Sequence, residues 1–254
     1  MKYSIRCIIL ILFLLLAACG RKGPLIPPEA LVPAAVDTLR VEQKGWDFRV
    51  SWRAPGKEQS GRPLRDLAGF RLLRRQIVPG EPDCSACSDA WQLLATVDLD
   101  LPRSVQQHDG FYLYRDGGML PGKAAQYRLV AFSKSGGVSR PATSPVRTLL
   151  PVPAAPSLKA GTTPTAITLE LSSGLMTDSG FAGFNLYRRT AGEEPVPFPH
   201  NPAPITTPVY EDQRVDYGRS YRYSATVLVK IGDDLVESLP SAEVEVPFSL
   251  QEIR

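Results

Sequence analysis

The sequence is poor in the side chains on which most catalytic and metal sites depend. Only two histidines occur among its 254 residues, so a metal site built from imidazole ligands has little to draw on. It also contains no nucleophile elbow, no phosphate-binding glycine loop and no spaced acidic cluster. These absences exclude the common enzyme classes. We therefore predict a binding protein and not an enzyme, with no catalytic residue, no metal and no cofactor.

Long apolar runs and sustained helical periods are scarce as well. The apolar run from Ile8 to Leu16 is far shorter than the ~20 residues that cross a bilayer. The 24 prolines and 20 glycines favour frequent turns over long helices. Both observations predict an all-β fold for the body of the chain.

The N-terminus has the pattern of a secretory signal. Lys2 and Arg6 precede the short apolar run, and Leu16-Ala17-Ala18-Cys19 closes it. This closing sequence resembles a bacterial lipobox, which implies that residues 1–18 are a signal peptide and that Cys19 is lipidated. Gly20, not an aspartate, follows Cys19, so the usual inner-membrane retention signal is absent. The resemblance predicts a lipid-anchored protein of the outer membrane that faces the periplasm.

Excess charge is missing too, which narrows the possible partners. The formal net charge is +3, and it falls to about +1 when Lys2 and Arg6 leave with the signal. So small a value argues against a nucleic-acid partner, because that binding needs a concentrated basic surface. Basic residues gather between Arg40 and Arg75, where they form either solvated strand faces or a site for an anion.

Residues 19–35 form a segment rich in glycine and proline, and we predict an extended tether there. Its start, Cys19-Gly-Arg-Lys-Gly-Pro-Leu, resembles the mature end of the outer-membrane lipoprotein family LptM. The resemblance implies docking on the lipopolysaccharide translocon LptD–LptE, whose maturation that family assists. The partner-binding residues would be Gly20, Lys22, Gly23, Pro24 and Leu25. The alternative is a generic flexible lipoprotein tether.

Strand patterns begin at Val36 and fill the rest of the chain. Phe48, Val50 and Trp52 alternate onto one face, and similar short strands follow from Gly69, Trp91, Phe111 and Tyr127.

The pattern then repeats. Gly183-Phe-Asn-Leu-Tyr-Arg-Arg echoes Gly69-Phe-Arg-Leu-Leu-Arg-Arg 114 residues later, and the strand at Tyr221 echoes that at Tyr127 94 residues later. Two copies of one small β-unit are indicated.

These copies resemble fibronectin type III domains, which are immunoglobulin-like β-sandwiches. The resemblance rests on Trp52, on the third strand that starts with Gly-Phe, and on the tyrosine that opens the sixth strand. It implies that Tyr127 and Tyr221 are tyrosine-corner residues, whose hydroxyl bonds to nearby backbone. We predict domain 1 at residues 36–150, a proline-rich linker at 151–156 and domain 2 at 157–248.

Cys84 and Cys87 are the two cysteines that lie outside the signal region. Their spacing in a polar loop fits a local disulfide, because residues i and i+3 of a turn lie close together. Thiol exchange with a partner is the alternative. Thioredoxin-type chemistry would need a following helix, and zinc would need two more ligands.

Six prolines between Pro195 and Pro208 form a further unusual segment. We predict that this run replaces an edge strand and blocks sheet-to-sheet pairing; it could otherwise serve as a ligand for an aromatic groove. Two functions follow from the whole sequence. The chain is an accessory of lipopolysaccharide export that acts through its tether, or an adhesion lipoprotein that binds a polysaccharide or protein through its two sandwiches.

Overall fold

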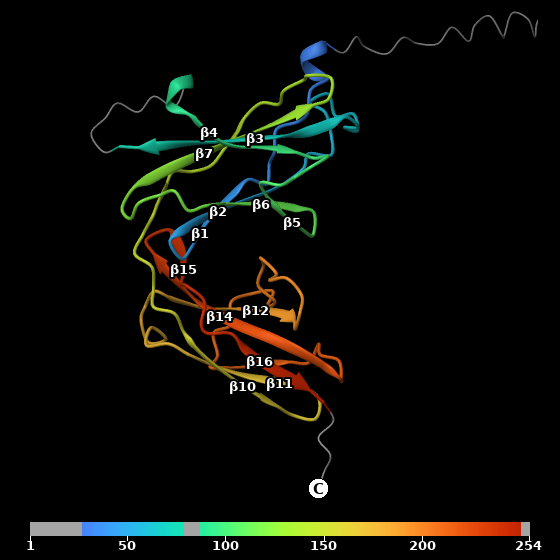
Figure 1. The fold of residues 1–254 in the computed structure, drawn as a ribbon. Helices are drawn as coiled ribbons and strands as arrows, with labels where there is room; N and C mark the ends of the chain where they lie inside the picture. Colours follow the sequence, from blue (N-terminus) through green and yellow to red (C-terminus); the bar gives the residue numbers. More distant parts are fainter. Residues whose placement is uncertain (1–26, 79–86, 250–254) are drawn as a thin grey trace, which may run out of the picture.

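The computed structural model describes residues 27–78 and 87–249, in which nearly all regular structure is β-strand (Figure 1). The all-β prediction is confirmed. Two β-sandwiches follow one another along the chain, and we call residues 36–150 the first sandwich and residues 157–248 the second sandwich. Two short 3-10 turns accompany them, η1 (Pro28–Ala30) and η2 (Ser88–Ala90).

The first sandwich consists of one sheet in the order β1-β2-β6-β5 and one in the order β4-β3-β7, with β8 and β9 both paired to β7. Its strands are β1 (Arg40–Lys44), β2 (Asp47–Arg53), β3 (Leu67–Ile77), β4 (Gln92–Asp98), β5 (Gln106–His108), β6 (Phe111–Asp116), β7 (Ala124–Ser133), β8 (Ala142–Thr143) and β9 (Arg147–Thr148).

The second sandwich repeats this plan, with the sheet β10-β11-β13 facing the sheet β12-β14, to which β15 and β16 are added. Its strands are β10 (Ser157–Thr162), β11 (Ile167–Ser172), β12 (Phe181–Thr190), β13 (Val209–Asp212), β14 (Arg219–Ile231), β15 (Asp234–Glu237) and β16 (Val244–Phe248). In the first sandwich β1, β2 and β6 oppose β3, β7 and the short strands β8 and β9. In the second, β10, β11 and β13 oppose β12, β14 and the strands β15 and β16. This is the fibronectin type III order that the sequence predicted.

Each sandwich has its own hydrophobic core, built from side chains that alternate along the strands. In β7 every second residue is buried, including Tyr127 and Leu129. Trp52 is fully buried and packs against the rings of Phe70 and Tyr112, with centroids 5.6 Å and 5.9 Å away. The core of the second sandwich is centred on side chains of β11, β12 and β14. The buried residues of the two cores form separate clusters.

The glycine of the Gly-Phe pair in β3 and in β12 is required, because neighbouring backbone lies too close to leave room for a side chain. A side chain at Gly69 would place its Cβ 2.0 Å from the carbonyl oxygen of Val97 in β4. Gly183 has φ near +129°, and a Cβ there would lie 2.9 Å from the carbonyl oxygen of Ile205. The proline segment that contains Ile205 therefore occupies the position beside β12 that β4 occupies beside β3.

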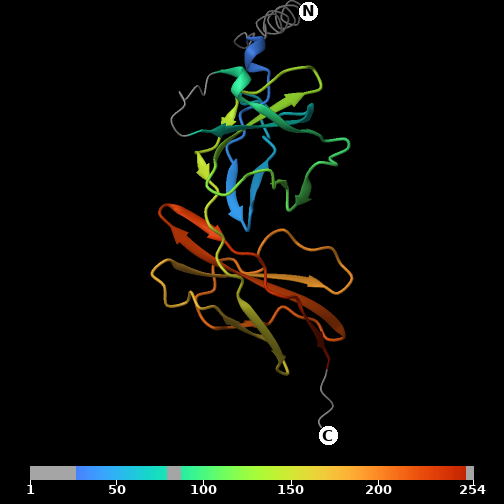
Figure 2. The same ribbon diagram turned by 60° about the vertical axis from the view of Figure 1, so that its left-hand side comes forward.

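The two sandwiches share a sheet at their junction. The β14–β15 hairpin extends toward the first sandwich, and β15 pairs in parallel with β1, with Gln43 opposite Val236 and Lys44 opposite Glu237. A single sheet thus runs β12-β14-β15-β1-β2-β6-β5 across both units. Figures 1 and 2 show β15 beside β1 at the junction, with η1 at the opposite end of the first sandwich.

Candidate functional site

The residues predicted for lipidation and docking lie outside the part of the chain that the structure describes. This applies to Cys19, Gly20, Lys22, Gly23, Pro24 and Leu25. Their roles stay predictions.

The end of the predicted tether is bound to the first sandwich. The backbone N–H groups of Gln59 and Ser60 donate to the carbonyls of Val32 and Ala30, over 2.9 Å and 2.7 Å, and Ala34 N–H donates to the Lys57 carbonyl. The description of residues 19–35 as an extended tether is therefore wrong for residues 30–34, which pair with a loop of the domain. Proline and glycine content indicated a flexible segment but could not reveal this backbone pairing.

The predicted disulfide is only partly within the described residues. Cys84 lies outside them, and Cys87 directly precedes η2. The bond between Cys84 and Cys87 stays a prediction.

The structure corrects the role of Tyr127. Its hydroxyl donates to the carboxylate of Asp116 over 2.7 Å and not to the backbone, and the guanidinium of Arg74 binds the same carboxylate at 2.8 and 2.9 Å. All three residues are at least nine-tenths buried. Burial, followed by the hydrogen bond to Asp116, raises the pKa of Tyr127 far above its usual value, so the hydroxyl remains a donor.

The second sandwich contains the same network, with its tyrosine two residues after the predicted one. Tyr223, not Tyr221, donates to the carboxylate of Asp212 over 2.9 Å, and Arg188 binds it at 2.8 Å. In the sheet registers Arg74 is opposite Tyr127, and Arg188 is opposite Tyr223. The two sixth strands therefore correspond with a shift of two residues from the sequence alignment.

Tyr221 forms the bond expected of a tyrosine corner. Its hydroxyl accepts from the backbone N–H of Asp216, five positions upstream, over 2.8 Å. The position that corresponds to Tyr221 in the first sandwich is Ala125, so that sandwich has no such corner at this position. The tyrosine-corner assignment holds for Tyr221 and is wrong for Tyr127.

Asp212 has an additional partner that Asp116 lacks. His200 Nε2 lies 3.3 Å from its carboxylate, which is fully buried. Burial alone would raise the pKa of Asp212, but the hydrogen bonds from His200, Tyr223 and Arg188 outweigh burial and hold the pKa well below its usual range.

The proline run covers the edge of β12, as predicted. The N–H and carbonyl of Leu186 bond to the side chain of Asn201 and the N–H of His200, each over 2.7 Å. Phe184 exchanges both backbone bonds with Ile205. Since these groups are satisfied by an irregular segment, the edge of β12 at Phe184 and Leu186 is closed to pairing with another chain.

The same run also covers the outer face of the first sandwich. Arg49 donates to the Pro197 carbonyl over 2.7 Å, and the Phe198 ring lies 5.4 Å from that of Phe111 and 5.6 Å from that of His108. Leu113, on the same outer face, is only 4% exposed. Sequence reasoning missed this contact, although β6 has apolar residues on both of its faces and such a strand is typically covered on both sides.

Side chains fasten the junction between the sandwiches. The amide of Gln43 donates to the Leu150 carbonyl over 2.8 Å and accepts from the Leu150 N–H over 2.9 Å. Arg147 forms an ion pair with Asp234. The Gln43 bonds hold the last residue of the first sandwich, directly before the linker, against β1, and the Arg147–Asp234 pair joins the first sandwich to β15.

A buried carboxylate lies at the centre of the junction. Glu237 is 4% exposed and accepts hydrogen bonds from Tyr187 over 2.5 Å and Thr226 over 2.7 Å, and the ammonium of Lys44 lies 3.7 Å away. Lys44 also sits 3.6 Å from the centre of the Tyr187 ring. Burial lowers the pKa of Lys44, and burial followed by the Glu237 charge raises that of Tyr187.

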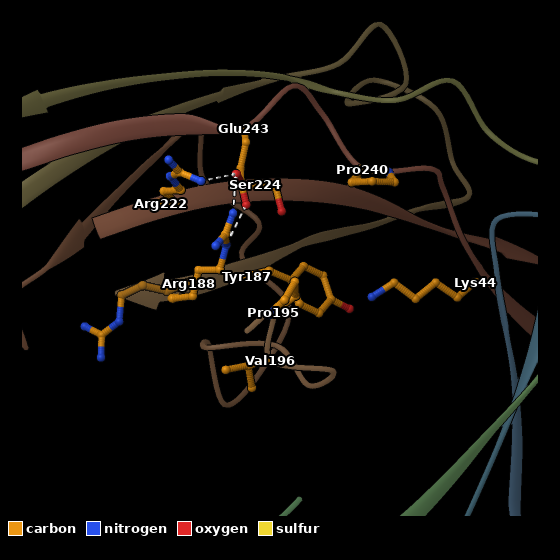
Figure 3. A pocket seen from close by; sticks show the side chains of 10 residues that line it. Lys44, Tyr187, Arg188, Pro195, Val196, Arg222, Ser224, Pro240 and Glu243 are labelled. Atoms are coloured by element: carbon orange, nitrogen blue, oxygen red, sulfur yellow. Dashed lines mark hydrogen bonds and ion pairs between the residues drawn. The ribbon is translucent and has the colours of Figure 1, made fainter. Parts of the chain in front are cut away.

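Two hollows open beside this junction and share Lys44, Pro195, Val196 and Pro240 in their walls. The smaller has a volume of about 150 Å³ and contains Arg189, which binds Glu243 through two bonds of 2.8–2.9 Å (Figure 3). Figure 3 shows Lys44 reaching from the first sandwich toward Tyr187 of the second. The larger hollow, with a volume of about 620 Å³, lies between the proline run and the sheet β2-β6. We call it the junction cleft.

Within residues 27–78 and 87–249, the structure contains no helix long and apolar enough to span a membrane. Comparison with curated proteins gives no match. Among solved structures, the FN1–FN3 domains of chicken CNTN1 match with 14% identity and a TM-score of 0.33, covering 87% of this chain and 68% of that one. The chicken interferon gamma receptor alpha chain matches with 13% identity and a TM-score of 0.33, covering 87% and 100%. Scores this low add nothing to the fold assignment, which rests on the strand order.

The comparison with protein families concerns the segment that precedes the sandwiches. Residues 6–28 include the lipobox-like sequence and the glycine- and proline-rich stretch that follows it. They match the model described as the conserved region of the LPS-assembly lipoprotein LptM.

Proposed function

We propose that this chain is a lipid-anchored, non-enzymatic accessory of lipopolysaccharide assembly, acting at the outer membrane from the periplasmic side. The match of residues 6–28 to the LptM conserved region carries this proposal. Cys19 would hold the acyl chains, and Gly20, Lys22, Gly23, Pro24 and Leu25 would contact the LptD–LptE translocon. The two sandwiches would form the part of the molecule that presents a binding surface to the periplasm.

The chemistry of the segment suits docking in a shaped groove. Gly20 and Gly23 permit backbone angles that other residues avoid, and Pro24 has no N–H to satisfy. Lys22 supplies a cation close to the lipid phosphates.

The experiment changes the sequence of the docking segment while keeping its length. Replacing Gly23-Pro24-Leu25 by three serines preserves reach and lipidation but removes the proline constraint and the apolar side chain. The variant should remain membrane-bound and lose co-purification with LptD–LptE from crosslinked envelopes. A chain cut after residue 33 should keep that association. Unchanged co-purification of the serine variant, or none with the wild type, would contradict the proposal.

Adhesion through the sandwiches is the second candidate, and the junction cleft is the observation that favours it. In that case the serine variant would keep its partner, and loss of the sandwiches would abolish binding.

A further inference from the structure

The junction cleft is a concave site that the proposed tether function does not use. Its walls come from the outer face of β2 and β6, the loop before β5, the proline run and residues 238–240. A volume of about 620 Å³ falls within the range of ~300–1,000 Å³ that is usual for small-molecule sites.

The charged groups that line the cleft are mainly cations. Lys44, Arg49, Arg103 and Arg115 line it, against the single carboxylate of Asp47. Arg115 is paired with Asp47. The excess of cations gives the cleft a positive potential, which a concave surface of low dielectric concentrates.

Two further carboxylates pair with cations of the wall but do not line the cleft themselves. Arg49 is bound by Glu42 at 2.6 Å and Lys44 by Glu237 at 3.7 Å, and neither glutamate lines the cleft. Arg103 is exposed and forms no ion pair with any residue that the structure describes.

One donor of Arg49 is also unused. Its Nε is buried and has no hydrogen-bond partner among the described residues. This atom is closed to solvent, so a ligand in the cleft would bind the terminal nitrogens of Arg49 and not its Nε.

The remaining wall combines polar residues, such as Ser104, Gln106 and Ser238, with an apolar part. Val105 and Leu113 come from the first sandwich, and Val196 and Leu239 from the second. Leu239 is 47% exposed despite its size. An inorganic anion would leave this apolar surface in contact with water, whereas an anion with an apolar body would cover it.

We propose that the junction cleft binds an organic anion with one phosphate or carboxylate group on an apolar body of small-molecule size. The ligand is a soluble compound and not a lipid of the surrounding bilayer. The reason is position, because η1, which directly follows the segment proposed to hold the lipid anchor, lies at the end of the first sandwich opposite the junction (Figure 1).

The test uses the mature lipoprotein in phosphatidylcholine nanodiscs and 1-naphthyl phosphate as a fluorescent probe. Anisotropy should report saturable binding of one probe per chain, absent from empty nanodiscs. Inorganic phosphate and 1-naphthol should each bind at least tenfold more weakly than the probe, as judged by the concentration of each that displaces half of it. Equal competition by 1-naphthol would show that binding does not need the anionic group and would contradict the proposal. Displacement of the probe by phosphatidylglycerol in the nanodisc would contradict a soluble ligand.

Two variants locate the binding site. Arg103→Ala removes a cation without breaking any ion pair among the described residues, and it should weaken binding at least fivefold. Val196→Trp fills the cleft without changing charge and should abolish binding. Arg140→Ala is the matched control, since Arg140 is an exposed arginine outside the cleft. Equal effects of the control and Arg103→Ala, or binding retained by Val196→Trp while its circular dichroism is native, would overturn the assignment.

Discussion

The two sandwiches are copies of one unit, but they cover the outer edge of the third strand, β3 in the first and β12 in the second, in different ways. In the first sandwich β4 pairs with β3 as a β-strand over six residues, with one irregularity in register between Leu72 and Leu73. In the second, the proline run satisfies β12 with one bridge, a backbone bond from His200 and the side chain of Asn201. The irregular solution frees Pro197 and Phe198 to reach the first sandwich. An edge cover that is not a strand can thus also serve as an interdomain contact.

The largest expected effect separates the two cores. Trp52→Ala should destabilise the first sandwich by about 3–5 kcal/mol, and Leu171→Ala should destabilise the second by about 2–5 kcal/mol, because each creates a buried cavity. We expect two calorimetric transitions, with a different one shifted in each variant. A single transition that moves as a whole in both variants would show that the junction makes the sandwiches one cooperative unit.

The two tyrosine–aspartate–arginine networks should differ in their sensitivity to loss of charge. Asp116→Asn leaves Arg74, whose side chain is 8% exposed, without its counter-charge, and should cost about 3–5 kcal/mol. Asp212→Asn should cost less, because Arg188 is 22% exposed and water can solvate it. Chemical denaturation of both variants measures the difference; equal losses would mean that the exposure of the arginine does not matter.

Acid should affect the second network in a defined direction. Because the folded-state pKa of Asp212 is depressed, its contribution to stability is present above the unfolded value of about 4 and is lost as the pH falls below that value. The free energy of unfolding of the second sandwich should therefore fall between pH 5 and pH 2, and Asp212→Asn should reduce this slope. An identical slope in the variant would show that other carboxylates account for the acid sensitivity.

The smallest effect concerns the junction. Gln43→Ala removes two hydrogen bonds to Leu150 and should cost about 1–2 kcal/mol. It should also broaden the distribution of interdomain orientations measured by small-angle scattering. Gln126→Ala is the control, since Gln126 bonds to Ser144, six residues farther from the linker than Leu150. If both variants scatter like the wild type, Gln43 does not hold the junction.

Sequence reasoning identified the strands because alternation is a local property that each strand displays by itself. It misaligned the sixth strands because Tyr221 and Tyr223 face the same side, and a shift of two residues keeps every side chain on its face. Only the partner strand, which places Arg188 opposite Tyr223, decides between them. The junction could not be predicted, because the pairing of β15 with β1 depends on how two folded units meet. The one local sign of the junction was β6, where the apolar residues Phe111 and Leu113 lie on the outer face, which in an isolated sandwich would be exposed to solvent.

Because residues 30–34 pair with the backbone of the first sandwich, the length of the preceding segment limits the distance between that sandwich and Cys19. If Cys19 is anchored in lipid, the nine residues from Cys19 to Pro27 span about 30 Å at full extension. The first sandwich can then stand no higher than this above the membrane surface, and its η1 end must be the lower one. The second sandwich and the junction cleft, at the other end, then have an upper limit on their height that the length of this segment sets. Inserting residues before Pro27 would raise both without altering either.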